Sequence, residues 1–462
     1  SGLSTAYLLR DYAPVVFELH DRFGGSAQGE HWAGTHNSLG NAYVITPDAG
    51  TFLEDLYRQL GLQRVVRVDE GDFEIELNGK ILDDFFAAKG QPPEVAQAFQ
   101  RYREVVLNMA NVDYPDIPLP DGKDNQWILD LDKKTFRADI EQQMGMPVPD
   151  LLAAAVQAYC YSSFGAGWEE ISAASGWNFL AAEEFGRWVF PGGNAWMAHQ
   201  FWHRLTRPNT GRHGAQLHGS SRVVDVRLMT GNKVLVTYLD SGGHCRSMSA
   251  KRVVMCCSKM IAKHIIHDLS GLDADKSAAM EGLDYRAYVV VNVLLNAPIE
   301  RDFYDIFLLG DGNFPMSEPE AQANSRVIDM LSGHFARGAK IPRSVLTLYW
   351  PLPFNFGRWT LLIEEGWQNY TQAVVPQIQA MLSMLNVKPS AVRQVRMTRW
   401  GHAMPIARPG LIANGVTDAL RRPIDDRIYF VNQDNWALPA VENCLLDAEI
   451  FTPQIAAGLT RR

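Results

Sequence analysis

The sequence lacks the features of a membrane-spanning or nucleic-acid-binding protein. No stretch approaches the roughly 20 apolar residues that a transmembrane helix requires. The formal net charge is −9 and no long basic stripe offsets it, which disfavours nucleic acid and anionic membranes as main partners. The 462 residues are 47% apolar and 21% charged, as in an ordinary soluble globular protein. We therefore expect a small-molecule substrate and no integral membrane segment.

Cysteine is also scarce. Its positions are odd in number and show no paired metal-binding spacing: Cys160, Cys245, Cys256, Cys257 and Cys444. This pattern indicates neither a disulfide framework nor a metal site. Reduced thiols favour a cytoplasmic over a periplasmic location. The absence of a visible signal peptide decides nothing, because the sequence begins inside a motif.

Length and periodicity predict two domains that combine helices and strands. A chain of 462 residues is too long for one ordinary core. Because elements of one kind recur far apart, each domain is expected to contain several separate segments. Apolar periodicity predicts helices over 1–10, 50–62, 370–385 and 440–459, and mostly helical structure over 93–190. Strand patterns cover 13–19, 221–228, 233–239, 252–257, 288–295, 344–350 and 427–432, with short strands over 64–82.

The first residues contain parts of a dinucleotide-binding motif. Ser1–Ser4 reads as the end of a glycine-rich turn that enters a helix, with Gly2 where a third glycine allows close helix–strand packing. Glu18 closes the strand over 13–19, where an acid accepts hydrogen bonds from the adenosine ribose. A surface acid that merely ends a strand explains Glu18 alone equally well.

Two neighbouring runs resemble the flavin amine oxidase family. Glu18–Gly25, ELHDRFGG, resembles the family's E-x-x-x-R-x-G-G, and Leu39–Tyr43, LGNAY, resembles its D-x-G-x-x-Y segment. The resemblance implies FAD as the cofactor, with the paired glycines close to its phosphates. The residues of these runs that it assigns to cofactor binding are Arg22, Gly24, Gly25, Ser26, Gly40 and Asn41.

The sequence departs from the family pattern here in two places. Ser26 stands where the family usually has an arginine, which removes one expected phosphate contact. The strand and the two glycines that open the motif would precede Ser1. We therefore expect further residues upstream of this sequence rather than a new fold.

Later segments resemble other parts of the same cofactor site. Phe190–Ala195, FPGGNA, resembles the glycine turn that re-enters the FAD domain, and Val223 lies on a strand whose backbone faces the adenine. Asp434 occupies the place of an acid near the flavin ribityl chain and pyrophosphate. Val441 and Glu442 begin the last helix, whose N–H groups would point at the flavin pyrimidine oxygen.

The resemblance implies an α/β fold, with a discontinuous Rossmann-type FAD-binding domain of the GR2-like kind joined to an α+β substrate domain. The FAD-binding domain is expected over 1–62, 190–275 and 395–462. The substrate domain is expected over 63–189 and 276–394.

A weaker resemblance points to the spermidine dehydrogenase-like subgroup. It is carried by Phe190–Ala195, Ser344–Trp350, Val375–Leu385 and Arg399–Ala403. Acids near the substrate domain could neutralise a polyamine, although a solvated helix face explains them as well: Glu169, Glu170, Glu183 and Glu184. Aromatic residues at mixed helical spacing either line an apolar pocket or form core: Tyr159, Tyr161, Phe164, Trp168, Trp177 and Phe179.

The candidate catalytic residues differ from the family pattern. In amine oxidases two aromatic side chains flank the amine at the flavin, and the position of the second is Ala440 here. Trp436 from the loop, or Trp400 and His402 from the preceding strand, are the candidates to replace it, although a core role explains Trp400 equally well. Many amine oxidases also carry a lysine on the strand over 288–295, where Asn292 is the only strongly polar side chain.

These patterns favour an FAD-dependent oxidoreductase that removes hydride from the C–N bond of an amine or amino-acid-like substrate. One alternative is an FAD-dependent desaturase or isomerase with an apolar substrate, and another is a non-catalytic flavoprotein-like binding subunit. Pocket polarity discriminates the first two, because acids within reach of the flavin indicate an amine and an uninterrupted apolar tunnel indicates the rival. The sequence leaves open whether the protein forms a homo-oligomer.

Overall fold

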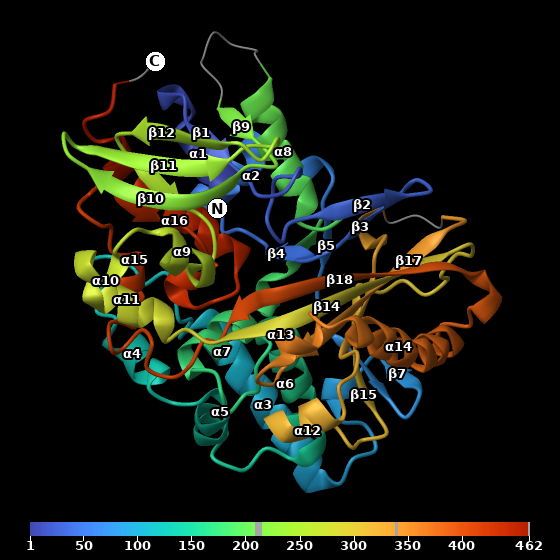
Figure 1. The fold of residues 1–462 in the computed structure, drawn as a ribbon. Helices are drawn as coiled ribbons and strands as arrows, with labels where there is room; N and C mark the ends of the chain where they lie inside the picture. Colours follow the sequence, from blue (N-terminus) through green and yellow to red (C-terminus); the bar gives the residue numbers. More distant parts are fainter. Residues whose placement is uncertain (208–214, 338–340, 461–462) are drawn as a thin grey trace.

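One large mixed sheet and two short pairs of parallel strands organise the molecule, seen here in a computed structural model (Figure 1). The structure describes residues 1–207, 215–337 and 341–460. Helices and strands are mixed along the whole chain, so the predicted combination of the two is confirmed.

The two parallel pairs join four segments that lie far apart in the sequence. β1 (Val15–Phe17) pairs with β9 (Gln216–His218), and β13 (Val253–Met255) pairs with β19 (Ile428–Phe430). Both pairs belong to the same end of the fold. Helix α1 (Gly2–Leu8) contacts β1 and also α16 (Val441–Ala456), and α16 packs through Phe451 against Tyr429 of β19. The first and last helices of the chain therefore lie side by side (Figure 1).

Two further elements complete this end of the molecule. Helix α8 (Ala195–Thr206) packs on α1, and a three-stranded antiparallel sheet follows β9. Its strands are β10 (Arg222–Met229), β11 (Lys233–Leu239) and β12 (Cys245–Ala250).

The large sheet has seven strands in the order β18, β14, β17, β16, β15, β6, β7. Neighbouring strands are antiparallel, except that β15 and β6 are parallel. The bounds are β6 (Glu74–Leu77), β7 (Lys80–Leu82), β14 (Tyr285–Leu295), β15 (Asp305–Gly310), β16 (Asp329–Ser332), β17 (Ser344–Leu352) and β18 (Val392–Pro405).

Strand β14, second in the sheet order, is buried on both faces, which explains its mostly apolar sequence. Alternate residues Val289, Val291 and Val293 pack against helix α14 (Glu364–Met384), since successive side chains of a strand point to opposite faces. Tyr288 and Asn292 therefore face the other side, toward the N-terminal segments. This second face carries most of the polar groups described below.

Short strands connect the two ends of the molecule. β2 (Gly29–Trp32) and β3 (Thr35–Ser38) form an antiparallel hairpin. β4 (Tyr43–Ile45) and β5 (Arg67–Asp69) both pair with β8 (Arg187–Val189), which places the segment after the hairpin beside the large sheet.

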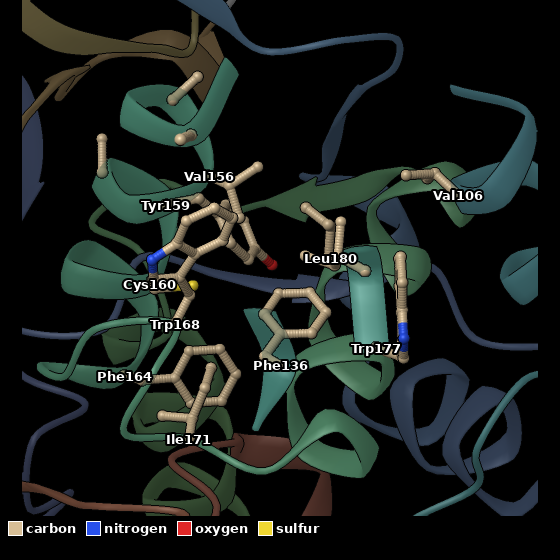
Figure 2. Packing of buried hydrophobic residues seen from close by; sticks show 14 of the residues in the cluster. Val106, Phe136, Val156, Tyr159, Cys160, Phe164, Trp168, Ile171, Trp177 and Leu180 are labelled. Atoms are coloured by element: carbon tan, nitrogen blue, oxygen red, sulfur yellow. The ribbon is translucent and has the colours of Figure 1, made fainter. Parts of the chain in front are cut away.

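The helical region has the largest apolar core. Five of the six aromatic residues at mixed helical spacing are fully or almost fully buried there, and Phe179 packs against them, so the core alternative is confirmed for this set. Figure 2 shows several of these rings packed together. The helices are α3 (Pro93–Asn111), α4 (Gln126–Asp132), α5 (Phe136–Met144), α6 (Asp150–Phe164) and α7 (Ala173–Leu180).

The remaining helices are short except for α14. Thr51 is the N-cap of α2. Its side chain accepts a hydrogen bond from the backbone N–H of Glu54 in the first turn, which fixes where that helix begins. The bounds are α2 (Phe52–Leu60), α9 (Lys259–Ile265), α10 (Leu269–Leu272), α11 (Ala274–Glu281), α12 (Glu318–Ala323), α13 (Gly357–Thr360) and α15 (Val416–Arg421).

Most predicted helices and strands are present, some with shorter bounds and some, such as α14, β14 and β17, with longer ones. The hairpin β2–β3 and the strands β12, β15 and β16 were not predicted from the sequence. β18 carries residues 395–405 into the large sheet, although the sequence assigns them to the cofactor segments. Within the described ranges, no helix combines the length and apolar character needed to cross a membrane.

Candidate functional site

Three strands of the large sheet hold the loop Ser38–Gly40, which precedes β4. The amide of Asn292 on β14 donates to the carbonyl oxygen of Ser38 at 3.0 Å. The indole of Trp400 on β18 donates to the carbonyl oxygen of Leu39 at 2.7 Å. The hydroxyl of Tyr349 on β17 donates to the carbonyl oxygen of Gly40 at 2.6 Å. Because these strands are adjacent, one sheet face fixes three successive peptide groups of a predicted cofactor segment.

Glycine allows this loop to pack closely. A Cβ at Gly40 would lie 2.1 Å from the carbonyl oxygen of Ser26, so no other residue fits without movement. Gly24 and Gly25 have φ values of 133° and 61°. A Cβ at Gly25 would meet no heavy atom within 4 Å, so this turn leaves room beside its backbone for a ligand.

The predicted nucleotide-binding residues lie around the first parallel pair. The backbone N–H of Ser221 donates to the carbonyl oxygen of Glu18 at 2.8 Å. This contact places the start of β10, with half-buried Val223, beside the acid. Gly2 opens α1, and Arg22 is exposed.

Asp434 is fully buried and engages the start of α9. One carboxylate oxygen accepts hydrogen bonds from the Ser258 hydroxyl (2.9 Å), the Lys259 N–H (2.7 Å) and the Tyr285 hydroxyl (2.6 Å). The other oxygen has no partner within the described part of the chain. The carboxylate is therefore fixed on one side and free to accept on the other.

Buried ionic groups hold the rest of this C-terminal loop. The ammonium group of Lys259 donates to the side chains of Asn432 and Asn435, and burial lowers its pKa. Asn435 and Trp436 donate to Asp447 at 2.6 and 3.1 Å, and burial raises the pKa of Asp447 to about 6. Trp436 is 2% exposed and packs in the helical core, a placement that favours a structural role for it.

The start of α16 contacts the segment after the loop. The Glu442 carboxylate accepts from the N–H of Ile45 on β4 at 2.7 Å, and burial raises the pKa of this acid. Half-buried Val441 packs against the apolar cluster around α1 and α8. The segment 38–45 is thus held by the large sheet on one side and by the last helix on another.

His402 lies next to the Asp434 network. It is half-buried on β18, with its ring 5.6 Å from that of Tyr285 in an edge-on contact. Burial and the nearby Arg358 lower the pKa of His402, so its ring is neutral near pH 7. A neutral imidazole can accept or donate a proton there.

Several buried polar atoms of the predicted cofactor segments have no hydrogen-bond partner among the described residues. Such groups are costly unless a ligand or water satisfies them. They lie on the loop before β4, on the glycine turn before α8, on the C-terminal loop and on the first turn of α16. The atoms are Asn41 Oδ1, Asn194 Oδ1, Asp434 Oδ1 and Asn443 Nδ2.

A cluster of buried carboxylates borders the segment 38–45. Glu183 accepts from the hydroxyl of Tyr43 on β4 at 2.8 Å and lies 3.4 Å from the guanidinium of Arg187. Arg187 also forms ion pairs with Asp305, at 2.9 Å, and with Asp69. One cation therefore faces three carboxylates in an interior region.

A fourth acid, Asp329, links this cluster to the three hydrogen bonds that hold the loop Ser38–Gly40, which we call the clamp. One of its oxygens accepts from the Ser162 hydroxyl at 3.0 Å, and the other has no partner within the described ranges. The Tyr288 hydroxyl lies 3.3 Å from the same serine, and its ring makes an edge contact with the ring of Tyr349. The carboxylates and the clamp thus share one face of the large sheet.

The acids of this cluster hold protons more tightly than acids in water. Burial raises the pKa of Asp305 to about 7, although Arg187 acts in the opposite direction. Burial also raises the pKa of Asp329, with the nearby Asp305 adding to the effect, and it raises that of Glu183. A positively charged ligand would favour the ionised form of these buried acids, so the cluster suits such a ligand.

Of the four acids predicted to neutralise a polyamine, the structure places only Glu183 in this cluster. Glu169, Glu170 and Glu184 pair instead with arginines: Arg137, Arg286 and Arg103 respectively. Groups of three or more histidine, cysteine or acidic side chains with metal-binding geometry are absent from the described residues.

Sequence reasoning missed Tyr349, Arg187, Asp305 and Asp329. The only available signal was a charged residue at the edge of an apolar run, as in the stretch DIFLLG that begins with Asp305. Their convergence depends on the sheet order, which the sequence pattern did not supply.

The comparisons with known proteins support this fold. No protein-family model matches the sequence, and no curated protein matches it. Solved structures do match: cyclohexylamine oxidase from Brevibacterium oxydans (17% identity, 99% of this chain and 97% of that one, TM-score 0.66) and wild-type putrescine oxidase bound to putrescine (15%, 99% and 97%, 0.68). A CLA-producing fatty acid isomerase from P. acnes is similar as well (11%, 98% and 95%, 0.68). The chain therefore shares the fold of these solved structures, in agreement with the fold that its sequence resemblance predicts.

Proposed function

We propose that the protein is an FAD-dependent oxidoreductase that removes hydride from the C–N bond of an amine or amino-acid-like substrate. One observation carries the cofactor assignment: four segments that resemble FAD-binding parts each present a buried polar atom that has no partner among the described residues. FAD has polar groups along its whole length and would satisfy such atoms. The similarity to cyclohexylamine oxidase and putrescine oxidase supports the same assignment.

The cofactor would lie along the proposed Rossmann-type domain formed by 1–62, 190–275 and the segment after β18. Glu18 and Val223 would hold the adenosine end, and the Gly24–Gly25 turn would lie at the phosphates. Asp434, with one oxygen fixed and one free, would accept from the ribityl or phosphate-proximal groups. Because the loop Ser38–Gly40 is already held by three hydrogen bonds, little ordering would be required on binding.

FAD supplies the hydride acceptor, and the chain supplies orientation and charge. The carboxylate cluster on the sheet face would attract and desolvate a cationic amine beside the segment 38–45. Asp329 has no cationic partner within the described residues, so a substrate ammonium would be its first. Glu183, Asp305 and Asp69 would add a favourable field, which Arg187 partly offsets. His402 is placed to exchange a proton near the Asp434 network.

A second candidate, an FAD-dependent isomerase or desaturase with an apolar substrate, is favoured by the similarity to the fatty acid isomerase. The buried carboxylates argue against it, because an uncompensated acid beside an apolar chain is unfavourable. A non-catalytic flavoprotein is a third candidate, which the same experiment addresses.

The test begins with flavin loading of the purified protein, followed by anaerobic mixing with amines and with unsaturated fatty acids. Bleaching of the flavin absorbance by an amine supports the proposal. Turnover of a fatty acid supports the second candidate, and a bound flavin that no donor reduces supports the third. No retained flavin after FAD addition refutes all three.

The role of the acids is tested with Asp329→Asn. We expect a higher KM for a cationic amine with kcat largely retained, since asparagine cannot ionise beside the bound ammonium as Asp329 would. Glu94→Gln, at an exposed acid in the first turn of α3, is the matched control and should change neither constant. Equal kinetic constants for Asp329→Asn and the wild type would remove the cluster from substrate binding.

A further inference from the structure

Four of the twelve histidines lie where the hairpin β2–β3 meets helix α8. His31 and His36 are cross-strand partners in the hairpin, and their ring centroids are 4.8 Å apart in an edge contact. His199 and His203 lie one turn apart on α8, with stacked rings 5.8 Å apart. The ring of Trp196, in the first turn of the helix, contacts His36 edge-on at 6.3 Å. We call the four residues the histidine cluster.

The histidine cluster lies in a positively charged environment. The charged side chains that act on it, within the described residues, are arginines: Arg204, Arg207 and Arg337. Arg343 lies over the ring of Trp32 in the same hairpin. Glu30, the acid of the hairpin, is paired with Arg396 of β18. Ion pairs between histidine and carboxylate occur elsewhere among the described residues, at His244 and His267. Positive charge on the cluster would therefore have no acid to offset it.

Glycines allow the chain that leads to the clamp to pack closely on α8. A Cβ at Gly24 would lie 3.2 Å from the Cβ of Ala198, and a Cβ at Gly29 would lie 3.0 Å from that of Ala195. The histidine cluster borders this contact, because His199 is the next residue of the helix. The packing of the hairpin on α8 thus holds the segment that runs from the Gly24 turn to the clamp.

The folded structure disfavours protonation of this cluster. Burial lowers the pKa of His36 below its ordinary value of 6.5, and the neighbouring His31, Arg337 and His199 add to the effect. Partial burial also lowers the pKa of His203, and nearby cationic groups lower it further. When the folded-state pKa of a histidine lies below its unfolded value, the folded contact is fully favoured above pH 6.5 and weakens as the pH falls below it.

We propose that the histidine cluster is a pH-sensitive switch that releases the hairpin β2–β3 from α8 when its imidazoles are protonated. The uncharged rings pack against each other and against Trp196, whereas imidazolium rings repel each other and the neighbouring arginines. A two-stranded hairpin is only marginally stable in water by itself, so the released hairpin loses its order. Because the hairpin leads directly into the clamp, flavin would be held less tightly at low pH. This last consequence rests on the proposed function, and the switch itself does not.

The test is hydrogen exchange of the full chain without flavin at pH 7.5 and pH 5.5, followed by mass spectrometry and corrected for the intrinsic pH dependence of exchange. Peptides that cover 29–38 should exchange about 10-fold faster at pH 5.5. This is the change expected for one histidine of pKa 6.5 that is protonated only when the hairpin is open. Helix α3, which contains no histidine, is the internal reference. Equal corrected rates of the hairpin at both pH values would overturn the proposal.

His36→Gln separates the switch from general loss of stability. Glutamine stays uncharged at both pH values, so the ratio of the two rates should fall toward one. If the variant only destabilised the hairpin, exchange would be faster at both pH values and the ratio would stay that of the wild type, which would also overturn the proposal. His244→Gln is the matched control and should keep the wild-type ratio, because His244 is exposed and lies beside Asp240.

His199→Glu tests the charge mechanism in the opposite direction. His199 is exposed on α8, so the substitution places an acid beside the imidazoles without removing a buried side chain. The hairpin of this variant should stay closed at pH 5.5, because the carboxylate offsets the imidazolium charge. Opening to the same extent as in the wild type would contradict the proposal. These measurements involve neither flavin nor turnover, so they can fail while the proposed function holds, and the reverse.

Discussion

The clamp on the loop Ser38–Gly40 is best tested with Tyr349→Phe, which deletes one hydroxyl and keeps the ring. That hydroxyl donates to the third carbonyl of the loop at 2.6 Å, and the carbonyl is buried. An unsatisfied buried acceptor costs about 1–3 kcal/mol. If the clamp prepares the loop for FAD, this energy is lost from binding, and the Kd for FAD should rise about 5- to 150-fold.

The measurement is titration of the apoprotein with FAD, followed by quenching of flavin fluorescence, together with thermal unfolding of the apoprotein. Tyr304→Phe is the matched control, because the Tyr304 hydroxyl is buried in the same region and has no partner among the described residues. It should leave the Kd unchanged. An unchanged Kd for Tyr349→Phe with reduced stability would refute the reasoning, since the clamp would then support only the fold.

Three other variants give separate tests. The pKa of Asp305 is about 7 in the folded protein and 3.8 ordinarily, so its contribution to stability is complete below pH 3.8 and is lost as the pH rises through 7. Asp305→Asn removes this loss. Urea unfolding at pH 4 and pH 8 should therefore show that the variant gains stability relative to the wild type, by on the order of 4 kcal/mol, at the higher pH. Gly40→Ala places a Cβ 2.1 Å from the Ser26 oxygen and should abolish flavin retention on gel filtration. Trp436→Phe removes the hydrogen bond to Asp447 and should lower the free energy of unfolding by about 1–2 kcal/mol while amine turnover of the loaded protein persists; lost turnover with intact stability would instead support a catalytic role.

The sequence predicted the helices and strands better than the contacts between them. Glycine turns and strand-ending acids carry local signals, so Gly24, Gly25, Glu18 and Asp434 could be found from short motifs. The run over 285–295 is buried on both faces and could be read as a strand from composition alone.

The interior of the site could not be found in this way, because its residues meet only through sheet order and register. Asp305 and Asp329 lie on short strands that the pattern did not reveal, and they come together since β15 and β16 are neighbours. The role of Trp400 also depends on strand register. Its sequence context allowed either a cage or a core position, and only the register of β18 against β14 reveals its hydrogen bond to the loop.

The parallel pair of β13 and β19 has a consequence for synthesis on the ribosome. Residues 253–255 find their partner only at 428–430, so the earlier strand emerges about 170 residues before the later one. At about 5–20 residues per second, it waits on the order of 10–30 s with one edge uncovered. The nascent chain is thus exposed to chaperones or to aggregation during that interval, and the proposed cofactor, which both ends of the chain would hold, could bind only after the last helix has been synthesised.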